Sequence, residues 1–255
     1  MQSMEHIGNT LYKYKQILED KGYNVVYIGV YGSQNYGLDD DKSDIDVKAI
    51  IIPSLHDIIF RKVTSTTIEC EEGNIDVKDL ITFYDVIKKG NFSYIEAIHS
   101  LYWIGDVEVR KLFYDYKTNL KSIVGAMYEK QKALTHEYPS KKEEFEKFGL
   151  DPKQFHHIIR LYDLLEQNCE EKEYSDDSYI CYPDGEYKDY LITIKRGLGI
   201  YTRESMIKEC DKYVTMAKEL LNNSYPDYKY EVIDMDDKVN QYLEKCILEE
   251  LKGRL

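Results

Sequence analysis

The chain has 255 residues, 43% of them hydrophobic, and a formal net charge of −13 at pH 7. This length and composition are typical of a globular protein that buries its core in one large domain or two small ones. The acidic balance is not offset by any basic segment, which argues against a protein that grips long nucleic acid non-specifically. A small local patch can still bind a nucleic-acid end.

Neither a membrane span nor a leader is visible. No apolar run reaches the roughly 18 residues of a membrane-spanning helix, and the first residues, MQSMEHIGNTLYKYKQ, lack the pattern of a signal peptide. The cysteines are scattered, odd in number and without a C-x-x-C pair; they are Cys70, Cys169, Cys181, Cys210 and Cys246. This pattern predicts free thiols in a reducing cytosol and argues against a disulfide framework or a zinc site.

The first third of the chain combines one helical pattern with several strand patterns. Apolar residues recur at helical spacing from Glu5 to Lys21, and Gly22 marks the expected end of that helix. β-Branched and aromatic runs predict strands over 24–33, 44–52, 64–70 and 75–81. Pro53 ends the second run, and EEGN between the last two indicates a hairpin.

From Phe83 onward the periodicity becomes helical. Helices are expected over 83–90, 94–103, 109–120, 122–137, 152–167, 202–223 and 236–255. The acidic stretch 168–187 is expected to be a loop, and 187–197 indicates a helix ended by Gly197, with a strand as the alternative. The elements predict an α+β fold, with a small mixed sheet in residues 1–110 and a mostly helical domain in residues 111–255.

Asp44 and Asp46 form an unusual pair at the edge of an apolar strand pattern. Side chains at positions i and i+2 of a strand share a face, so two carboxylates would lie close together and repel. A divalent cation such as Mg²⁺ relieves that repulsion, and Asp76 on another strand could join the pair. The alternative is that both are solvated loop residues, which is the preferred interpretation for Asp39 to Asp41.

Gly32 and Ser33 follow the first predicted strand. Glycine allows close approach of the backbone, exposed amides can cradle phosphate, and a serine hydroxyl adds a donor. A phosphate-binding turn that faces metal-binding carboxylates is the arrangement used in phosphoryl or nucleotidyl transfer. An ordinary turn is the alternative, since the full P-loop pattern is absent.

A basic helix face occurs more than 100 residues later. Lys153, His157 and Arg160 fall at i, i+4 and i+7, on one side of a helix that suits triphosphate or acceptor phosphates. A solvated face with a histidine at the edge of the core is the alternative. His156 points elsewhere and is expected to be structural.

These pieces together resemble the DNA polymerase β nucleotidyltransferase superfamily, and within it a bacterial and phage group of predicted nucleotidyltransferases. YGSQNYGLDDDKSDIDVKAI is similar to that group's G-S-x-x-Y-G-x-x-x-x-x-S-D-x-D. The group's hairpin, helix and Asn-x-x-x-x-Glu run resembles IDVKDLITFYDVIKKGNFSYIEAI. Its Lys-x-x-x-His-x-x-Arg-Leu helix resembles KQFHHIIRL, and its Ile-Lys/Arg-Arg-Gly motif resembles IKRG. The resemblance covers residues 24 to about 200. Phe92 stands where the group usually has proline.

The resemblance implies a role for each candidate residue. Asp44, Asp46 and Asp76 would be catalytic and would hold two Mg²⁺ ions, with Mn²⁺ as the alternative metal. Asp76 would also help to deprotonate the attacking hydroxyl. The nucleotide would be bound by Gly32, Ser33, Ser43, Lys153, His157, Arg160, Lys195 and Arg196. Asn91 and Glu96 are expected to be structural, as a helix cap and a buried pair.

The implied reaction transfers NMP from an NTP, expected to be ATP or CTP, to a hydroxyl acceptor and releases pyrophosphate. The expected acceptor is an RNA 3′ end such as that of tRNA, without a membrane partner, in the cytoplasm of a bacterial or phage-infected cell. One alternative is an adenylyltransferase that modifies a protein or small molecule, and another is a catalytically silent nucleotide-binding protein. Because Asp44, Asp46 and Asp76 are all present, silence is the less favoured interpretation. The oligomeric state is left open.

Overall fold

A computed structural model describes residues 2–40, 43–139, 142–169, 181–198 and 201–253. The chain forms two compact units, here named the sheet unit and the helical unit. The sheet unit comprises Met1–Lys117, Ser175–Cys181 and Glu231–Leu255, and the helical unit comprises Thr118–Tyr174 and Tyr182–Tyr230. The division expected at residue 110 stays a prediction, and most of the loop expected over 168–187 lies outside the described residues.

The sheet unit contains a mixed sheet with the strand order β3-β4-β2-β1-β5. The strands are β1 (Asn24–Val30), β2 (Val47–Ile52), β3 (Ser65–Cys70), β4 (Gly73–Asp79) and β5 (Trp103–Gly105). β2 and β4 run parallel, and every other neighbouring pair is antiparallel. This arrangement confirms the predicted α+β class with a small mixed sheet.

Two of these strands differ from the sequence-based expectation. β2 begins at Val47 rather than Asp44, although two bonds extend the pairing outward, from Ile45 N to Glu72 O and from Tyr31 N to Asp46 O. β5 lies at the end of a stretch that was expected to be helical. Helix α5 (Phe92–His99) stops at the extended residue Ser100, after which Trp103, Ile104 and Gly105 pair with β1. Aromatic and β-branched residues favour strands.

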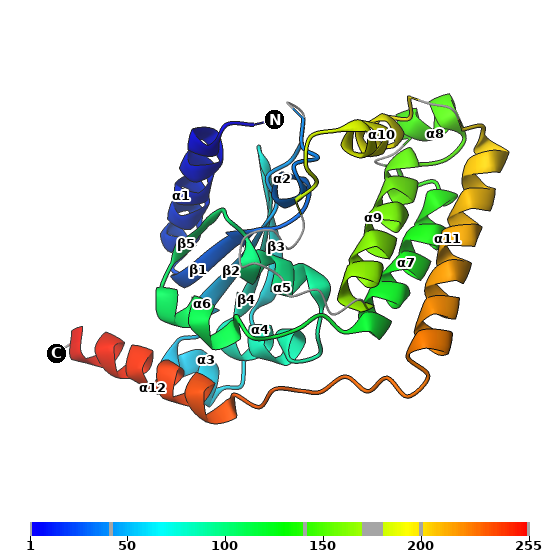
Figure 1. The fold of residues 1–255 in the computed structure, drawn as a ribbon. Coiled ribbons are helices and arrows are strands. Elements are labelled where there is room, and N and C mark those ends of the chain that lie inside the picture. The colour runs from blue at the N-terminus through cyan, green and yellow to red at the C-terminus, as the bar shows by residue number, and fades with distance from the viewer. Residues whose placement is uncertain (1, 41–42, 140–141, 170–180, 199–200, 254–255) are drawn as a thin grey trace. The chain divides into compact units, whose positions relative to one another are not determined.

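Alternate residues of the sheet point into two separate hydrophobic cores, one on each face. Ile28, Val47 and Val77 pack with α1 on one face, and Tyr27 and Ile50 pack on the opposite face with residues of α4, α5, α6 and α12. Figure 1 shows these helices around the sheet. The helices of this unit are α1 (Met4–Asp20), α2 (Ser33–Tyr36), α3 (Leu55–Ile59), α4 (Leu80–Ile87), α5 (Phe92–His99), α6 (Val107–Phe113) and α12 (Asp236–Gly253).

The terminal helix α12 completes the second of these cores. Val239, Tyr242 and Leu243 of this helix are buried there. The Tyr84 hydroxyl donates to Asp236 Oδ1 at 2.6 Å, and the Tyr242 hydroxyl donates to Asp106 Oδ2 at 2.8 Å. The last residues of the chain therefore stabilise the sheet unit, although they follow the helical unit in sequence.

The helical unit is built around three long helices that pack against one another. Its helices are α7 (Leu120–Leu134), α8 (Lys142–Phe148), α9 (Pro152–Cys169), α10 (Glu186–Lys195) and α11 (Arg203–Ser224). α7, α9 and α11 lie side by side in Figure 1, and α10 packs on α9. As predicted, Asp151 caps the start of α9, accepting from Lys153 N at 3.0 Å, and Gly197 follows α10 in a left-handed conformation.

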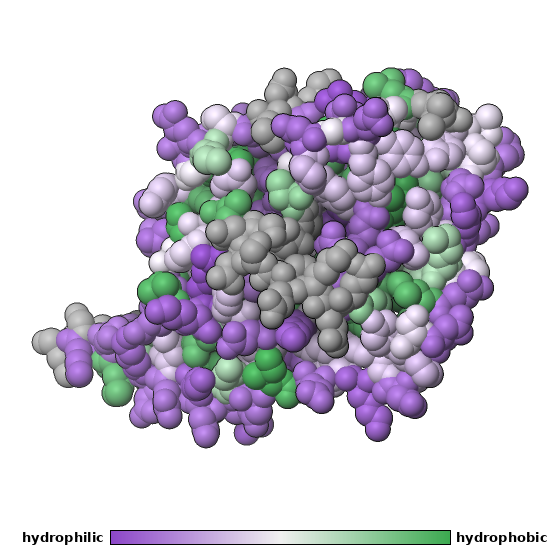
Figure 2. Space-filling view, in the orientation of Figure 1, coloured by the Kyte–Doolittle hydropathy of each residue, from purple (hydrophilic) through white to green (hydrophobic). Residues whose placement is uncertain are grey.

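The surface seen in Figure 2 is mostly hydrophilic, and hydrophobic side chains appear on it in small separate patches. Among the helices of the described residues, none is both long and apolar enough to cross a membrane.

Candidate functional site

The candidate site occupies one face of β2 and β4, on the side away from α1. The parallel register places Lys48 opposite Asp76, and Val47 opposite Ile75, so Asp46 lies beside Asn74 at the N-terminal end of both strands. Along β4, buried residues alternate with half-buried polar ones, which lie on this face. The expected i, i+2 alternation is found: Ile45 is buried, whereas Asp44 is exposed and Asp46 is half-buried.

Asp46 is held in place through one carboxylate oxygen. Oδ1 accepts from the backbone N–H of Asn74 at 2.9 Å and from its Nδ2 at 3.2 Å. Oδ2 makes no hydrogen bond or ion pair with the described residues, and neither does the exposed carboxylate of Asp44. One oriented and one open carboxylate therefore remain available to a ligand on this face.

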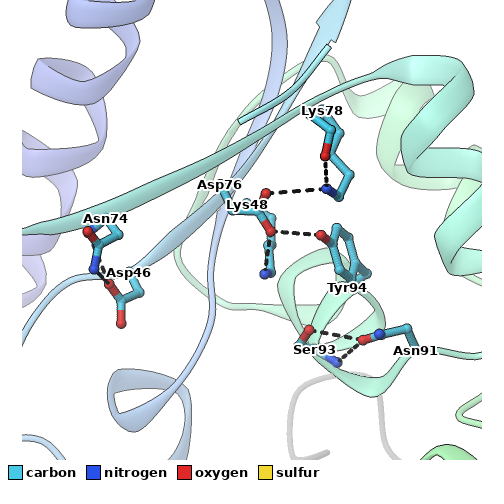
Figure 3. A network of polar contacts seen from close by, with 9 residues as sticks. Asp46, Lys48, Asn74, Asp76, Lys78, Asn91, Ser93 and Tyr94 are labelled. Atoms are coloured by element: carbon cyan, nitrogen blue, oxygen red, sulfur yellow. Dashed lines mark hydrogen bonds and ion pairs between the residues drawn. The ribbon is translucent and has the colours of Figure 1, made fainter. Parts of the chain in front are cut away.

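Asp76 is engaged by three partners, as Figure 3 shows. Its Oδ2 lies 2.7 Å from Lys48 Nζ and accepts from the Tyr94 hydroxyl at 2.7 Å. Its Oδ1 lies 3.6 Å from Lys78 Nζ, which also donates to Ser65 Oγ at 2.7 Å. Two lysines from neighbouring strands and one tyrosine from α5 thus fix the orientation of this carboxylate.

These partners also keep Asp76 ionised. Burial by itself raises the pKa of a carboxyl group, but the ammonium of Lys48, the Tyr94 hydroxyl and Lys78 together hold the pKa of Asp76 below its ordinary value. Lys48 is itself buried and lies over two rings, 4.1 Å from the centroid of Tyr31 and 4.4 Å from that of Tyr94. Such cation–π contacts stabilise a desolvated ammonium by about 0.5–2 kcal/mol each.

Lys48 and Tyr94 were not among the residues predicted from the sequence. The available signal for Lys48 was its position two residues after Asp46, which continues the same face of the strand. Its pairing with Asp76 depends on the register of β2 and β4, which connects residues 28 positions apart. Tyr94 reaches the same carboxylate from α5, and no local spacing indicates that contact.

The turn after β1 has the backbone expected of a glycine position. Gly32 has φ +99°, and a Cβ built on it would meet nothing within 4 Å, so the space above the turn is open. However, the Gly32 N–H donates to Glu96 Oε1, so this amide is already used. The Ser33 hydroxyl makes no hydrogen bond with the described residues, and a phosphate contact at this turn would rely on that side chain.

The buried side chain of Glu96 holds the turn after β1 in place through hydrogen bonds. It is only 2% exposed, and besides the Gly32 amide it accepts from Asn35 Nδ2 at 3.3 Å and from the hydroxyl of Tyr36. Asn91 caps α5 by accepting from Ser93 N at 3.1 Å. The structural placement expected for Asn91 and Glu96, a helix cap and a buried hydrogen-bonded group, is therefore found.

Asp39, Asp40 and Ser43, which lie between the Gly32 turn and Asp44, make hydrogen bonds that the sequence did not predict. Ser43 Oγ accepts from Asp40 N at 2.9 Å and donates to Asp40 Oδ1 at 3.1 Å, so this serine acts within its own loop. The expectation that Asp39 is solvated is wrong: it is 7% exposed and its Oδ2 accepts from Gln2 N at 2.6 Å. Asp41 lies outside the described residues.

In the helical unit, α9 carries the predicted basic residues Lys153, His157 and Arg160. His156 is structural, as expected: it is buried and its Nδ1 donates to Leu191 O at 3.0 Å. Burial, followed by the Arg160 guanidinium, lowers the pKa of His156 to about 3 and lowers that of His157 as well. Both imidazoles are therefore neutral near pH 7.

One lysine of α7, which the sequence pattern did not single out, joins this face. The pKa of Lys130 is lowered, first by burial and then by the positive charges of Arg160 and Lys153, with Asp151 opposing them. Lys195 ends α10, and Arg196 caps it through its backbone. Convergence of these basic residues on the carboxylates of the sheet unit stays a prediction.

The donor set on the sheet face suits a hard divalent cation. Asp44 and Asp46 offer carboxylate oxygens, the ligands that Mg²⁺ prefers. Within the described part of the chain, no group of three or more His, Cys, Asp or Glu side chains is arranged to hold a metal ion. The reason is visible at Asp76, whose oxygens are turned toward Lys48, Lys78 and Tyr94 rather than toward the other two acids.

Comparison with known proteins agrees with this geometry. Residues 7–121 match the model of RlaP, the RNA repair pathway DNA polymerase beta family. No curated protein matches the chain. The match spans the whole mixed sheet with α1, α4 and α5, and so includes every residue of the carboxylate face. The match supports the assignment of residues 7–121 to the DNA polymerase β nucleotidyltransferase superfamily, as the motifs in this part of the chain had indicated.

Proposed function

We propose that the protein transfers NMP from an NTP to the hydroxyl of an RNA 3′ end. The observation that carries this proposal is the arrangement on the β2–β4 face. Asp44 and Asp46 present open oxygens there, and Asp76 is held ionised one strand away. Carboxylates so placed, next to a turn with open space above it, are the parts that nucleotidyl transfer needs.

The chemistry assigned to the chain's own residues is a single in-line displacement. The acceptor oxygen forms a bond to the α-phosphorus, the bond from that phosphorus to the bridging oxygen breaks, and pyrophosphate leaves. Asp76 accepts the acceptor's proton, which requires the ionised state that Lys48, Tyr94 and Lys78 favour. Ser33 donates to a phosphate oxygen of the NTP, and Glu96 keeps the turn in place.

Divalent cations, two Mg²⁺ ions or Mn²⁺ in their place, would be held by Asp44 and Asp46 with a contribution from Asp76. Bound there, they would supply charge stabilisation for the attacking and leaving oxygens. In this proposal, Lys153, His157, Arg160, Lys195 and Arg196 of the helical unit, together with Lys130, contact the triphosphate or the acceptor phosphates.

RNA is the proposed acceptor because the matching family belongs to an RNA repair pathway. The net charge of −13 restricts the contact to a short terminal segment rather than a long duplex. ATP or CTP is the proposed donor. The described cysteines are all free, as is typical of a cytoplasmic protein, and we propose the cytoplasm as the place of the reaction.

A labelling experiment tests the proposal. The protein is incubated with Mg²⁺ and, in turn, α-labelled ATP, CTP, GTP and UTP, with total RNA and with lysate protein, and Asp46→Asn serves as the matched control. Label on RNA that depends on Asp46 is the expected result. Label on protein would instead support a protein-modifying adenylyltransferase, and nucleotide binding without transfer would support a catalytically silent protein.

A further inference from the structure

The sheet unit contains an ion pair between Lys48 and Asp76 that is largely shielded from solvent. Lys48 Nζ lies 2.7 Å from Asp76 Oδ2, inside a cage formed by the rings of Tyr31 and Tyr94. The Lys48 side chain is 8% exposed and that of Asp76 is 18% exposed. The contact is therefore shielded from water and is much stronger than an ion pair at the surface.

The same contact decides what Asp76 can bind. A carboxylate oxygen that already has an ammonium at 2.7 Å and a tyrosine hydroxyl at 2.7 Å has no space for a cation on that side. Its other oxygen faces a second ammonium, that of Lys78, at 3.6 Å. By contrast, among the described residues the Asp46 side chain accepts hydrogen bonds only from the neutral Asn74, and its Oδ2 is open to a ligand.

We infer that Lys48 is a resident cation of this site, which takes at Asp76 the place of one metal ion. The nucleotide-free protein then holds a divalent cation through Asp44 and Asp46 only, and Lys48 is a positioning residue that fixes the orientation of Asp76. This inference rests on the proposed function, because it concerns the carboxylates assigned to metal there. It differs from a three-aspartate cluster, in which all three carboxylates would share ions before the nucleotide arrives.

The inference predicts how many ions the nucleotide-free protein binds. Titration with Mn²⁺, followed by the electron paramagnetic resonance signal of free Mn²⁺, is expected to give one ion per wild-type chain. Lys48→Met removes the ammonium and leaves Asp76 open, so a second ion, or an affinity raised about tenfold or more, is expected. Lys78→Met is the matched control, since it removes the ammonium near Asp76 Oδ1 and leaves the Lys48 ammonium at Oδ2.

A charge-balanced double variant tests the inference even if Lys48→Met alone does not fold. Lys48→Met combined with Asp76→Asn removes both members of the pair, so no buried charge is left unpaired. If Asp76 takes no part in holding the resting ion, this variant binds one Mn²⁺ with an affinity within about threefold of wild type. A loss of about tenfold or more would overturn the inference, as would identical binding by wild type and a folded Lys48→Met.

Failure of the inference can be told apart from failure of the proposed function by Asp46→Asn. This variant is expected to abolish Mn²⁺ binding. Binding that depends on Asp46 and is also lost in the charge-balanced variant would overturn only the role of Lys48. Absence of binding to the wild type, or binding that Asp46→Asn leaves unchanged, would overturn both.

Discussion

In the sheet unit, the buried ammonium of Lys48 is paired with a charge of opposite sign, 2.7 Å from Asp76 Oδ2. In the helical unit, charges of the same sign lie near one another: the pKa of Lys130 is lowered by burial and then by Arg160 and Lys153. The Lys48–Asp76 pair of the first unit is compensated without a ligand. In the second unit Asp151 and Asp163 oppose part of this repulsion, and a bound anion would reduce it further.

This difference separates the proposed roles of the two units. In the proposed function, the sheet face would bind cations and accept a proton, and the ionised Asp76 beside Lys48 suits that role. In the same proposal the face of α9 would bind phosphates, because Arg160 and Lys153 disfavour the charged form of Lys130 and an added anion would favour it. Variants that alter one unit and leave the other intact can test this separation.

The largest effect is expected for Asp46→Asn. The asparagine Oδ1 can still accept from Asn74, so the fold should be retained, while the charge that would hold a metal ion is lost. We expect kcat/KM for NMP transfer to fall by about 100-fold or more. Initial rates with labelled NTP measure this, with thermal melts as the check on folding. A turnover rate like that of wild type would exclude Asp46 from the site.

Arg160→Ala addresses the other unit. A charge-assisted contact to phosphate contributes roughly 1.5–3 kcal/mol, so kcat/KM is expected to fall by about one to two decades. Because Arg160 is only 6% exposed, added salt should reduce this effect little.

Lys208→Ala, at an exposed position of α11, is the matched control for charge. Assays well below the melting temperature separate loss of the contact from loss of the fold. Unchanged kcat/KM in a folded Arg160→Ala protein would show that this helix face takes no part in the reaction.

The parts of the site that could be predicted from the sequence are those encoded by local spacing. The hairpin, the capped start of α9 and the i, i+2 aspartate pair each depend on residues a few positions apart. The match over residues 7–121 supports the part of the resemblance that lies in those residues, and the motifs of α9 and α10 lie outside it. The place where β2 begins was harder to predict, because Ile45 and Asp46 continue its backbone pairing beyond the regular strand.

The parts that could not be predicted depend on register and packing. Lys48 meets Asp76 only because β2 and β4 pair in parallel, and Tyr94 reaches the same carboxylate only because α5 covers that face. Burial of Asp39 likewise depends on Gln2, which lies 37 residues away. β5 was missed because a segment of three residues carries too little periodicity to distinguish a strand from the end of a helix.

Glu96→Gln tests how far the Gly32 turn depends on the buried carboxylate beneath it. Gln offers one acceptor oxygen where Glu96 uses two, so one of the donors from Gly32, Asn35 and Tyr36 loses its partner. The free energy of unfolding of the sheet unit is expected to fall by about 1–3 kcal/mol.

The only tryptophan of the chain, Trp103, stacks on Tyr27 within the sheet unit, so its fluorescence in urea reports on that unit. Tyr36→Phe, which removes one donor and leaves both oxygens, is expected to cost less. An unfolding midpoint for Glu96→Gln equal to that of wild type would contradict the assigned role.

The smallest effect is a pH dependence expected in the helical unit. The folded pKa of His156 is about 3, whereas the ordinary value is 6.5, because burial and Arg160 disfavour its charged form. Between these values the unfolded chain binds more protons than the folded one. Stability is therefore fully present above about pH 6.5 and decreases as the pH falls toward 3, by at most about 1.4 kcal/mol per pH unit. His157, whose pKa is also lowered, acts in the same direction.

His156→Asn isolates this contribution, because the amide nitrogen of asparagine can replace Nδ1 as the donor to Leu191 O but does not titrate. Urea unfolding followed by far-ultraviolet circular dichroism at pH 7, 6 and 5 should give a smaller loss of stability in this variant than in wild type. His136→Asn, at an exposed position of the same unit, controls for removal of a histidine and should follow the wild-type curve. Parallel curves for wild type and His156→Asn would mean that the buried imidazole is not kept neutral by its surroundings. The lowered pKa of His156 would then no longer support the contrast between the paired charges of the sheet unit and the clustered basic groups of the helical unit.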